Sequence, residues 1–184
     1  LDDPWLGPEQ PPVVVAVGRL TEQKDFPTLI RAFAALRATR PCRLMILGQG
    51  ELLETLKALC GVLGVADDVR FCGFQANPWN YMRGASVFVL SSAWEGFGNV
   101  LAEALSLGVP VVSTDCPYGP REILQGGRLG RLVPVGEPAK LAEAMASTLD
   151  HPPAPGPLMA GALRFTRDVS GAQYLRLLLA QDPG

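Results

Sequence analysis

The sequence lacks the features that define several common classes of protein. Its 184 residues contain no apolar run near the roughly 18 residues that a membrane-spanning helix requires. The formal net charge of −2 leaves no surplus of basic residues for binding a nucleic acid or an anionic lipid surface. We therefore predict neither a transmembrane segment nor a nucleic-acid partner.

Residues suited to metal or nucleophilic chemistry are equally scarce. The four cysteines, Cys42, Cys60, Cys72 and Cys116, form no C-x-x-C pair, and we interpret them as buried thiols in a reducing compartment. The sequence has no Asp-x-Asp pair for a Mg²⁺–diphosphate complex and no P-loop motif. The only histidine, His151, lies in a proline-rich stretch, where it can form no Ser-His or Cys-His pair. We predict no metal site and no cofactor.

The sequence does contain a regular alternation of short, apolar, β-branched runs with helical patterns. We expect strands at 13–17, 44–47, 69–72, 87–90, 111–114 and, more weakly, 128–133, and helices at 27–36, 51–63, 78–83, 100–107 and 138–149. This alternation predicts an α/β fold with a Rossmann-like, parallel, six-stranded sheet and helices on both faces. In such sheets ligands bind at the carboxyl ends of the strands, so functional residues should follow strands directly.

The chain divides into three expected segments. Proline-rich residues 1–12 are predicted to be a linker between domains, and residues 13–150 the Rossmann-like domain. Residues 151–184 are predicted to begin with a stiff, extended linker at 151–157 and to end in a helix, in which Ser170 and Gln173 form a capping box. A chain that opens with Leu1 and Asp2 is expected to be a piece of a longer protein.

Residues 91–105 give the strongest functional signal. A strand is followed by a loop with Gly96 and Gly98 and then by a helix, whose first N–H groups and dipole favour an anion. Glu103 lies about one turn into this helix, which is otherwise apolar and expected to be buried. Its carboxylate should reach back toward the anion site and grip ribose hydroxyls. A plain tight turn and a buried ion pair of Glu103 are the alternatives.

Charged and aromatic residues are placed around the same edge by the order of elements. Arg19 follows the first strand and Lys24 precedes the first helix, so both could hold a diphosphate, although ordinary surface charge is an alternative. Glu95 alone would be a solvated loop carboxylate. Trp79, Trp94 and Tyr118 are interpreted as packing residues. The segment 48–50, Gly-Gln-Gly, lacks the third glycine of the dinucleotide fingerprint, which argues against a nicotinamide dehydrogenase.

Together these motifs resemble a known enzyme family. Glu95 and Glu103 have seven residues between them, as in the E-x7-E signature of retaining glycosyltransferases of family 4, which have the GT-B fold. Segments 18–20 with Lys24, 69–73, 108–112 and 119–123 resemble further signatures of that family, and the resemblance runs from about Pro12 to Leu149. One departure is Asp25, where the family usually has a glycine after the lysine.

The resemblance implies the C-terminal, donor-binding half of a metal-independent glycosyltransferase. Its donor would be a UDP- or GDP-linked sugar and its acceptor a glycan or a lipid-linked molecule. Arg19 and Lys24 would contact the diphosphate, Glu95 the donor sugar and Glu103 the ribose, with Arg19, Lys24 and Glu95 as the catalytic residues. The further donor-binding positions that the resemblance implies are Gly18, Phe74, Gly96, Phe97, Gly98, Asn99 and Val100.

A GT-B enzyme has two such domains with the active site between them. The resemblance therefore implies that the acceptor site and the membrane-contacting surface belong to an absent N-terminal half, toward which residues 165–179 would pack. We expect this chain to bind nucleotide without turnover, and the intact enzyme to retain the anomeric configuration in the cytoplasm or at the inner face of the cell membrane. Two alternatives stay open: a sugar-nucleotide epimerase of the same fold, and a non-catalytic interaction module in which Arg19, Lys24 and Glu103 form a buried ion network.

Overall fold

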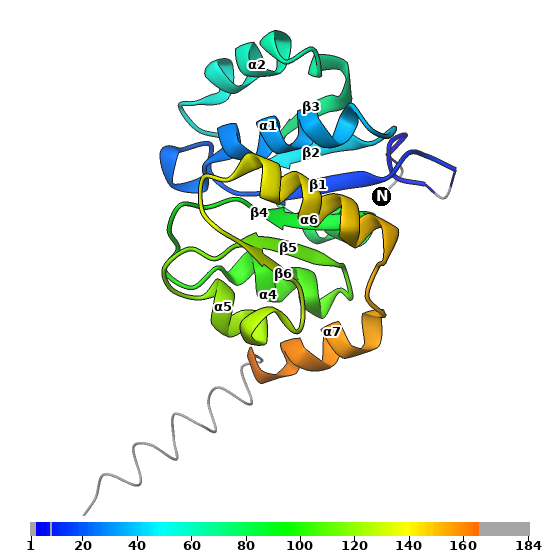
Figure 1. Ribbon diagram of the computed structural model, residues 1–184, viewed down its shortest axis with the longest axis vertical. Coiled ribbons are helices and arrows are strands. Elements are labelled where there is room, and N and C mark those ends of the chain that lie inside the picture. The colour runs from blue at the N-terminus through cyan, green and yellow to red at the C-terminus, as the bar shows by residue number, and fades with distance from the viewer. Residues whose placement is uncertain (1–2, 8, 166–184) are drawn as a thin grey trace, which may run out of the picture.

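A parallel sheet of six strands forms the centre of the computed structural model, which describes residues 3–7 and 9–165 (Figure 1). The strand order is β3-β2-β1-β4-β5-β6, and every neighbouring pair is parallel. The strands are β1 (Val13–Val17), β2 (Arg43–Leu47), β3 (Val69–Gly73), β4 (Val87–Leu90), β5 (Val111–Thr114) and β6 (Arg131–Val133). This arrangement confirms the predicted Rossmann-like α/β fold, with the switch in strand order between β1 and β4.

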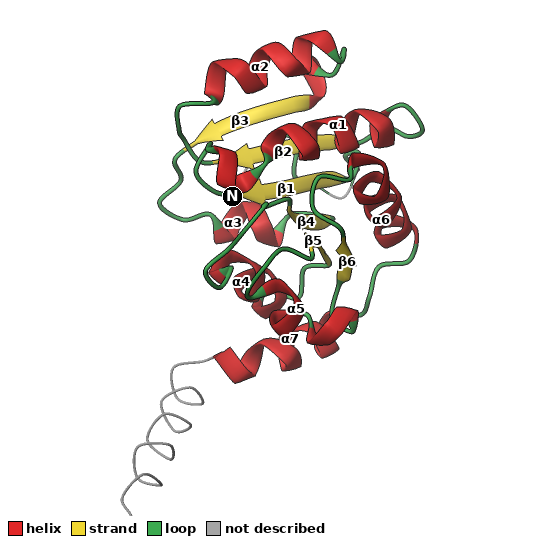
Figure 2. Ribbon diagram, turned by 60° about the vertical axis from the view of Figure 1, so that its left-hand side comes forward, coloured by secondary structure: helices red, strands yellow, loops and turns green. Residues whose placement is uncertain are grey.

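Helices cover both faces of the sheet (Figures 1 and 2). They are α1 (Phe26–Arg37), α2 (Leu53–Val62), α3 (Trp79–Arg83), α4 (Asn99–Ser106), α5 (Pro120–Ile123), α6 (Pro138–Asp150) and α7 (Pro155–Ala162), and 3-10 turns include η1 (Glu22–Lys24), η3 (Gln125–Gly127) and η4 (Leu163–Phe165). Val14 and Ala16 of β1 belong to a core cluster shared with α1, α2 and α6. Val13 and Val15 point to the other face, where α3, α4, α5 and α7 contribute to a second cluster. Burial on both faces explains why the central strands are continuous apolar runs.

Most of the expected elements are present, within a few residues of their predicted ends. The sixth strand begins at Arg131 rather than at 128, because residues 125–127 form the turn η3, in which Gly126 and Gly127 have positive φ angles. The short helix α5 was not predicted from the sequence.

The proline-rich stretch at 151–157 is a correction to the sequence-based expectation. It is not extended throughout, because α7 begins at Pro155. Prolines in the first turn of a helix lose no hydrogen bond, since those N–H groups have no partner inside the helix. Leu158 and Ala162 of α7 are buried in the cluster that includes α4. The helix expected over 165–179 and its capping box lie outside the described residues.

The N-terminal segment predicted as a linker is packed against the domain where the structure describes it. The guanidinium groups of Arg43 and Arg70 lie 4.9 and 3.9 Å from the ring centroid of Trp5. Arg70 Nη1 also lies 3.0 Å from both carboxylate oxygens of Asp3. Residues 3–6 are therefore anchored to the first residues of β2 and β3, at the edge of the sheet opposite the carboxyl ends of the strands.

Candidate functional site

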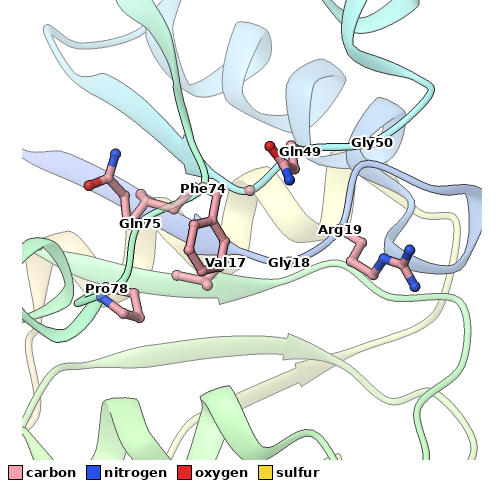
Figure 3. A pocket seen from close by; sticks show the side chains of 10 residues that line it. Val17, Gly18, Arg19, Gln49, Gly50, Phe74, Gln75 and Pro78 are labelled. Carbon is pink, nitrogen blue, oxygen red and sulfur yellow. The ribbon is translucent and has the colours of Figure 1, made fainter.

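The loops that follow β1, β2 and β3 line a cavity of about 720 Å³ at the carboxyl ends of the strands (Figure 3). Its lining residues are Val17, Gly18, Arg19, Leu47, Gly48, Gln49, Gly50, Phe74, Gln75 and Pro78. Three of them, Gly18, Arg19 and Phe74, are residues that the sequence placed in the donor site. This is the edge of the sheet at which ligands bind in folds of this kind.

One side of this cavity is built by close backbone contact between the loops after β1 and β2. The N–H of Gly18 donates to the carbonyl of Leu47 at 2.9 Å, and the N–H of Leu20 donates to the carbonyl of Gln49 at 3.1 Å. A Cβ atom on Gly48 would lie 1.8 Å from the carbonyl oxygen of Gly18, and one on Gly50 would lie 2.5 Å from that of Leu20. These two glycines therefore allow the loops after β1 and β2 to meet.

Arg19 and Phe74 present exposed side chains to this cavity. Phe74 is 71% exposed, and its ring is free to stack on a flat, aromatic ligand. Within the described part of the chain, the exposed guanidinium of Arg19 has no ion-pair partner. It can therefore offer all its N–H groups to an anion.

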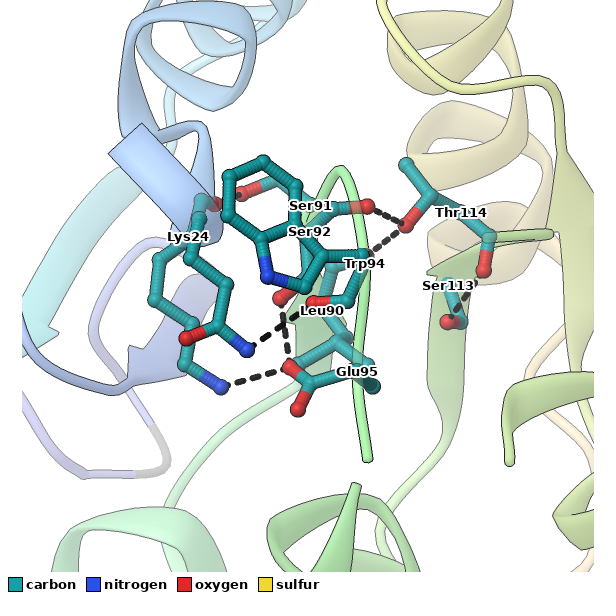
Figure 4. A network of polar contacts seen from close by, with 9 residues as sticks. Lys24, Leu90, Ser91, Ser92, Trp94, Glu95, Ser113 and Thr114 are labelled. Carbon is teal, nitrogen blue, oxygen red and sulfur yellow. Dashed lines mark hydrogen bonds and ion pairs between the residues drawn. The ribbon is translucent and has the colours of Figure 1, made fainter. Parts of the chain in front are cut away.

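Lys24 and Glu95 form a buried ion pair (Figure 4). Lys24 Nζ donates to Glu95 Oε1 at 2.5 Å, and the Ser92 hydroxyl donates to the same oxygen at 2.6 Å. The side chains of Lys24 and Glu95 are only 16% and 6% exposed. Glu95 is thus not a solvated loop carboxylate. The sequence predicted both residues in the donor site but did not predict the ion pair between them.

The loop that carries Glu95 is fixed from two directions. Ser91 Oγ donates to the carbonyl of Lys24 at 2.7 Å, and Gln23 Nε2 donates to the carbonyl of Trp94 at 3.0 Å. From β5, the hydroxyl of Thr114 donates to the carbonyl of Ser92 at 2.6 Å. These contacts hold the end of β4 against η1, so the ion pair has a fixed position.

The loop between Glu95 and α4 depends on two glycines. Gly98 has a φ of +89° and is the N-cap residue of α4, where no side chain caps the first N–H groups. Gly119 packs on the same loop, because a Cβ atom there would lie 1.8 Å from the carbonyl oxygen of Phe97. The first turn of α4 contains no acidic residue. Its positive end is therefore available to an anion.

Glu103 is half-buried on α4 and accepts a hydrogen bond from the indole N–H of Trp79 at 3.0 Å. The expectation of an entirely buried helix is wrong, since Asn99 and Ser106 are exposed while Leu101, Ala104 and Leu105 are buried. Among the described residues Glu103 forms no ion pair, so neither the alternative of a pairing with Arg or Lys nor the alternative of a network with Arg19 and Lys24 is found.

Glu103 does not line the cavity that contains Arg19 and Phe74. It lines a separate, smaller cavity of about 270 Å³ together with Phe97, Asn99, Ala102, Ser106, Ala162 and Phe165. The ring of Phe165 packs edge-on against Phe97, with 5.3 Å between centroids. Of the predicted site residues, the larger cavity thus contains Gly18, Arg19 and Phe74, the smaller one Phe97, Asn99 and Glu103, and the ion pair Lys24 and Glu95. The remaining three, Gly96, Gly98 and Val100, line neither of these two cavities.

The three aromatic residues interpreted as packing residues are exposed to different extents. Trp79 is 46%, Trp94 51% and Tyr118 79% exposed, so packing covers about half of each tryptophan and little of Tyr118. Trp79 is the residue that sequence reasoning missed, because its partner Glu103 lies 24 positions away on another helix. A tryptophan following a proline, 78–79, carries no sequence signal for such a contact.

The cysteines offer no activated nucleophile. Burial raises the pKa of Cys42, Cys60 and Cys72 to about 11 and also raises that of Cys116. All four are free thiols, with Cys72 half-buried rather than buried as predicted. Across residues 3–7 and 9–165, no cluster of three His, Cys, Asp or Glu residues could hold a metal ion, and no helix is long and apolar enough to cross a membrane.

Comparisons of the sequence with known proteins agree with this architecture. The family model described as glycosyl transferases group 1 matches residues 2–158. The lipopolysaccharide core biosynthesis glycosyltransferase LpsE of Rhizobium meliloti is 39% identical over 138 residues, which are 75% of this chain and 39% of that protein. An N-acetylgalactosaminyltransferase of Campylobacter jejuni, which acts on a diphospho-undecaprenol-linked saccharide, is 36% identical over 74% of this chain and 37% of its own length. The chain therefore spans less than half the length of these relatives.

Solved structures show the same similarity in three dimensions. The apo form of the lipopolysaccharide outer core galactosyltransferase WaaB superposes with a TM-score of 0.86 and 27% identity, over 95% of this chain and 50% of that one. HepE of Anabaena, solved in complex with UDP, gives a TM-score of 0.78 with 24% identity, over 94% and 49% of the two chains. The fold described here thus corresponds to about half of each of these proteins.

Proposed function

The chain belongs to the family of glycosyl transferases group 1, and we propose that it is the donor-binding half of a retaining, metal-independent enzyme of glycosyltransferase family 4. In this proposal the donor is a nucleotide-diphosphate sugar with a UDP or GDP leaving group. Residues 13–150 form the donor domain. The remaining length of the curated relatives, which this chain does not span, corresponds to the half that binds the acceptor.

The observation that carries this proposal is the convergence of cationic groups at one edge of the sheet. The guanidinium of Arg19, which has no ion-pair partner among the described residues, the ammonium of Lys24 and the N-terminus of α4 all lie at the carboxyl ends of β1 and β4. When the bond between the sugar and the diphosphate breaks, negative charge grows on the departing diphosphate. Fixed positive groups stabilise that charge in the transition state, which lowers the barrier without a metal ion.

Glu95 would then position the donor sugar rather than attack it. One carboxylate oxygen, Oε1, is occupied by Lys24 and Ser92. In the described part of the chain the other oxygen, Oε2, has no hydrogen-bond partner, so it can accept a bond from a sugar hydroxyl. The hydrogen bonds from Lys24 and Ser92 also hold the carboxylate in place.

The nucleoside would occupy the rest of the site. Phe74 stands at the mouth of the larger cavity, where its exposed ring and the backbone beside it can meet the base. Glu103 would accept hydrogen bonds from the ribose hydroxyls. The backbone would approach the phosphates and the sugar at the remaining predicted positions, which are Gly18, Gly96, Phe97, Gly98, Asn99 and Val100.

The acceptor class is inferred from the names of the relatives. LpsE is described for lipopolysaccharide core synthesis and the Campylobacter enzyme for a lipid-linked saccharide. We accordingly propose a glycan or lipid-linked acceptor and, because the cysteines are free, a cytoplasmic site at the inner face of the cell membrane.

The test of the reaction uses the longer natural protein that contains this chain. With its nucleotide-sugar donor and a glycan acceptor in EDTA, we expect transfer with the donor's anomeric configuration kept, read from the product by proton NMR. Glu95→Gln should reduce kcat at least about 100-fold, since an interaction with the transition state is lost. An inverted product would contradict the retaining assignment. Interconversion of sugar nucleotides without transfer would favour the epimerase.

A further inference from the structure

We propose that Trp79 is a positioning residue for Glu103, and that its indole N–H aims this carboxylate at the ribose of the donor nucleotide. The proposal rests on the proposed function, since it assumes that Glu103 binds ribose. It adds a residue from α3 to a site whose other members come from η1, the loops after β1 and β3, and the loop and helix after β4.

The contact between the two residues is specific. The indole nitrogen of Trp79 lies 3.0 Å from Glu103 Oε2, which is an ordinary hydrogen-bond distance, and it joins α3 to α4. Trp79 is 46% exposed, so core packing alone does not account for a tryptophan at this position. Its one polar atom donates to the carboxylate. This leaves the indole with one clear polar role.

The chemistry of the hydrogen-bond donor, the indole N–H of Trp79, matters as much as its position. A cation beside Glu103 would form an ion pair that a ribose would have to break or share. A neutral indole N–H supplies one hydrogen bond and leaves the charge of the carboxylate uncompensated. A carboxylate has about four acceptor positions, so after Trp79 takes one on Oε2, two vicinal hydroxyls can still be bound.

Trp79 also connects the two neighbouring cavities. Pro78, the residue before it, lines the larger cavity with Phe74 and Arg19, whereas Glu103 lines the smaller one. A nucleotide whose base lies by Phe74 must carry its ribose past the first turn of α3 to reach Glu103. The indole therefore holds Glu103 at the boundary that the ribose would cross. Without it, the flexible glutamate side chain would sample other rotamers and lose part of its preference for the hydroxyl pair.

The experiment compares two ligands that differ only in the ribose hydroxyls. Calorimetric titration would measure the binding of UDP and of 2′,3′-dideoxyuridine diphosphate, or of the corresponding pair with another base, to the 184-residue chain. We expect the unchanged protein to prefer the ribose form at least about tenfold, because the analogue leaves Glu103 without its hydrogen bonds. Trp79→Phe keeps an aromatic ring but removes the N–H, and it should reduce this preference about three- to tenfold by weakening UDP alone.

Two further variants of the chain serve as controls for the effect of Trp79→Phe. Trp5→Phe changes a tryptophan at the opposite edge of the sheet, where a phenylalanine ring can still contact Arg43 and Arg70, and it should leave both affinities unchanged. Adding Trp79→Phe to Glu103→Ala should have no further effect on the preference, because the group that Trp79 positions is gone.

Each other outcome overturns a defined part of the proposal. If Trp79→Phe weakens both ligands equally, or leaves the wild-type preference intact, Trp79 does not position Glu103, and the ribose assignment survives. If the unchanged protein binds both ligands equally well, Glu103 does not bind ribose. The ribose assignment of Glu103 and the positioning role of Trp79 are then both wrong. If it binds no nucleotide diphosphate at all, the proposed function of this domain fails as well.

Discussion

At the scale of single residues, the buried pair between Lys24 and Glu95 has structural as well as chemical consequences. The Glu95 carboxylate is buried and Lys24 is largely buried, so Glu95 depends on Lys24 for compensation of its charge. The sequence indicated both residues through a family resemblance, but it could not show a contact between positions that are 71 residues apart. The same holds for Trp79 and Glu103, because side-chain contacts between separate elements are set by packing and not by local pattern.

Removing the cation from this pair should destabilise the protein. Lys24→Met leaves the Glu95 carboxylate buried with only the Ser92 hydroxyl as partner, and we expect a loss of about 3 kcal/mol in the free energy of unfolding, measured with urea. The matched control is Lys57→Met, because the pair between Lys57 and Glu54 is exposed, at 51% and 80%. That change should cost less than about 0.5 kcal/mol. Equal losses in the two variants would contradict the structural role of the buried pair.

At the scale of elements, the loops at the carboxyl edge of the sheet are more strictly constrained than their sequence suggests. Alternating apolar and helical patterns allowed the six strands to be predicted, because fully buried strands leave a clear signature. Loop contacts leave none. Nothing in the sequence showed that Gly48 meets Gly18 or that Gly119 meets Phe97, yet these contacts define the walls of the site.

Gly48→Ala should be strongly unfavourable for this reason. The residue has a φ of +142°, and the new Cβ atom would lie 1.8 Å from the carbonyl oxygen of Gly18, so the loops after β1 and β2 must separate. We expect a loss of more than about 2 kcal/mol, read as a lower midpoint of urea unfolding. Gly61→Ala is the control within α2, where a Cβ atom meets nothing within 4 Å, and it should stabilise by about 0.5–1 kcal/mol. A tolerated Gly48→Ala would show that the two loops are not in contact.

The helix α7 offers a second test at this scale. Its start at Pro155 was missed because prolines usually indicate an interruption, although they are compatible with a first helical turn. Leu158 belongs to this helix and is 1% exposed, so Leu158→Ala should cost about 2–4 kcal/mol. Met159 is 48% exposed, and Met159→Ala should change stability by less than about 1 kcal/mol. Similar small effects in both variants would mean that 155–162 is not docked on α4.

At the scale of the whole molecule, the thiols link stability to alkaline pH. Burial raises the pKa of Cys42, Cys60 and Cys72 to about 11, whereas a thiol in the unfolded chain titrates near 8.5. Between those values the unfolded state binds fewer protons than the folded state, so the free energy of unfolding falls as pH rises from about 9 to 11.

Cys60→Ala should make this decline shallower. It removes one of the thiols that must stay protonated in the folded state, and urea unfolding at pH 8 and pH 10 would measure the change. Other groups that titrate in this range act equally on both proteins, so the difference between the two slopes isolates Cys60. Parallel slopes would mean that this thiol is ionised in the folded protein as readily as in the unfolded one.

As a whole, the fold of this chain corresponds to about half of the WaaB structure, and the central proposal is that it binds a nucleotide. The match to about half of the WaaB structure supports this organisation, and the edge of the sheet carries the residues that a nucleotide diphosphate requires. Whether those residues act together can be measured on this chain directly.

The most direct measurement is thermal unfolding of the 184-residue chain in EDTA with UDP, GDP, ADP and their sugar conjugates. A ligand present at 100 times its dissociation constant adds about 2.7 kcal/mol, which is a shift of several degrees for a domain of this size. We predict a shift with one base, unchanged by added Mg²⁺ and lost in Glu103→Ala and Arg19→Ala. Unchanged unfolding temperatures with every nucleotide at millimolar concentration would contradict the account of this domain as a nucleotide-sugar donor site.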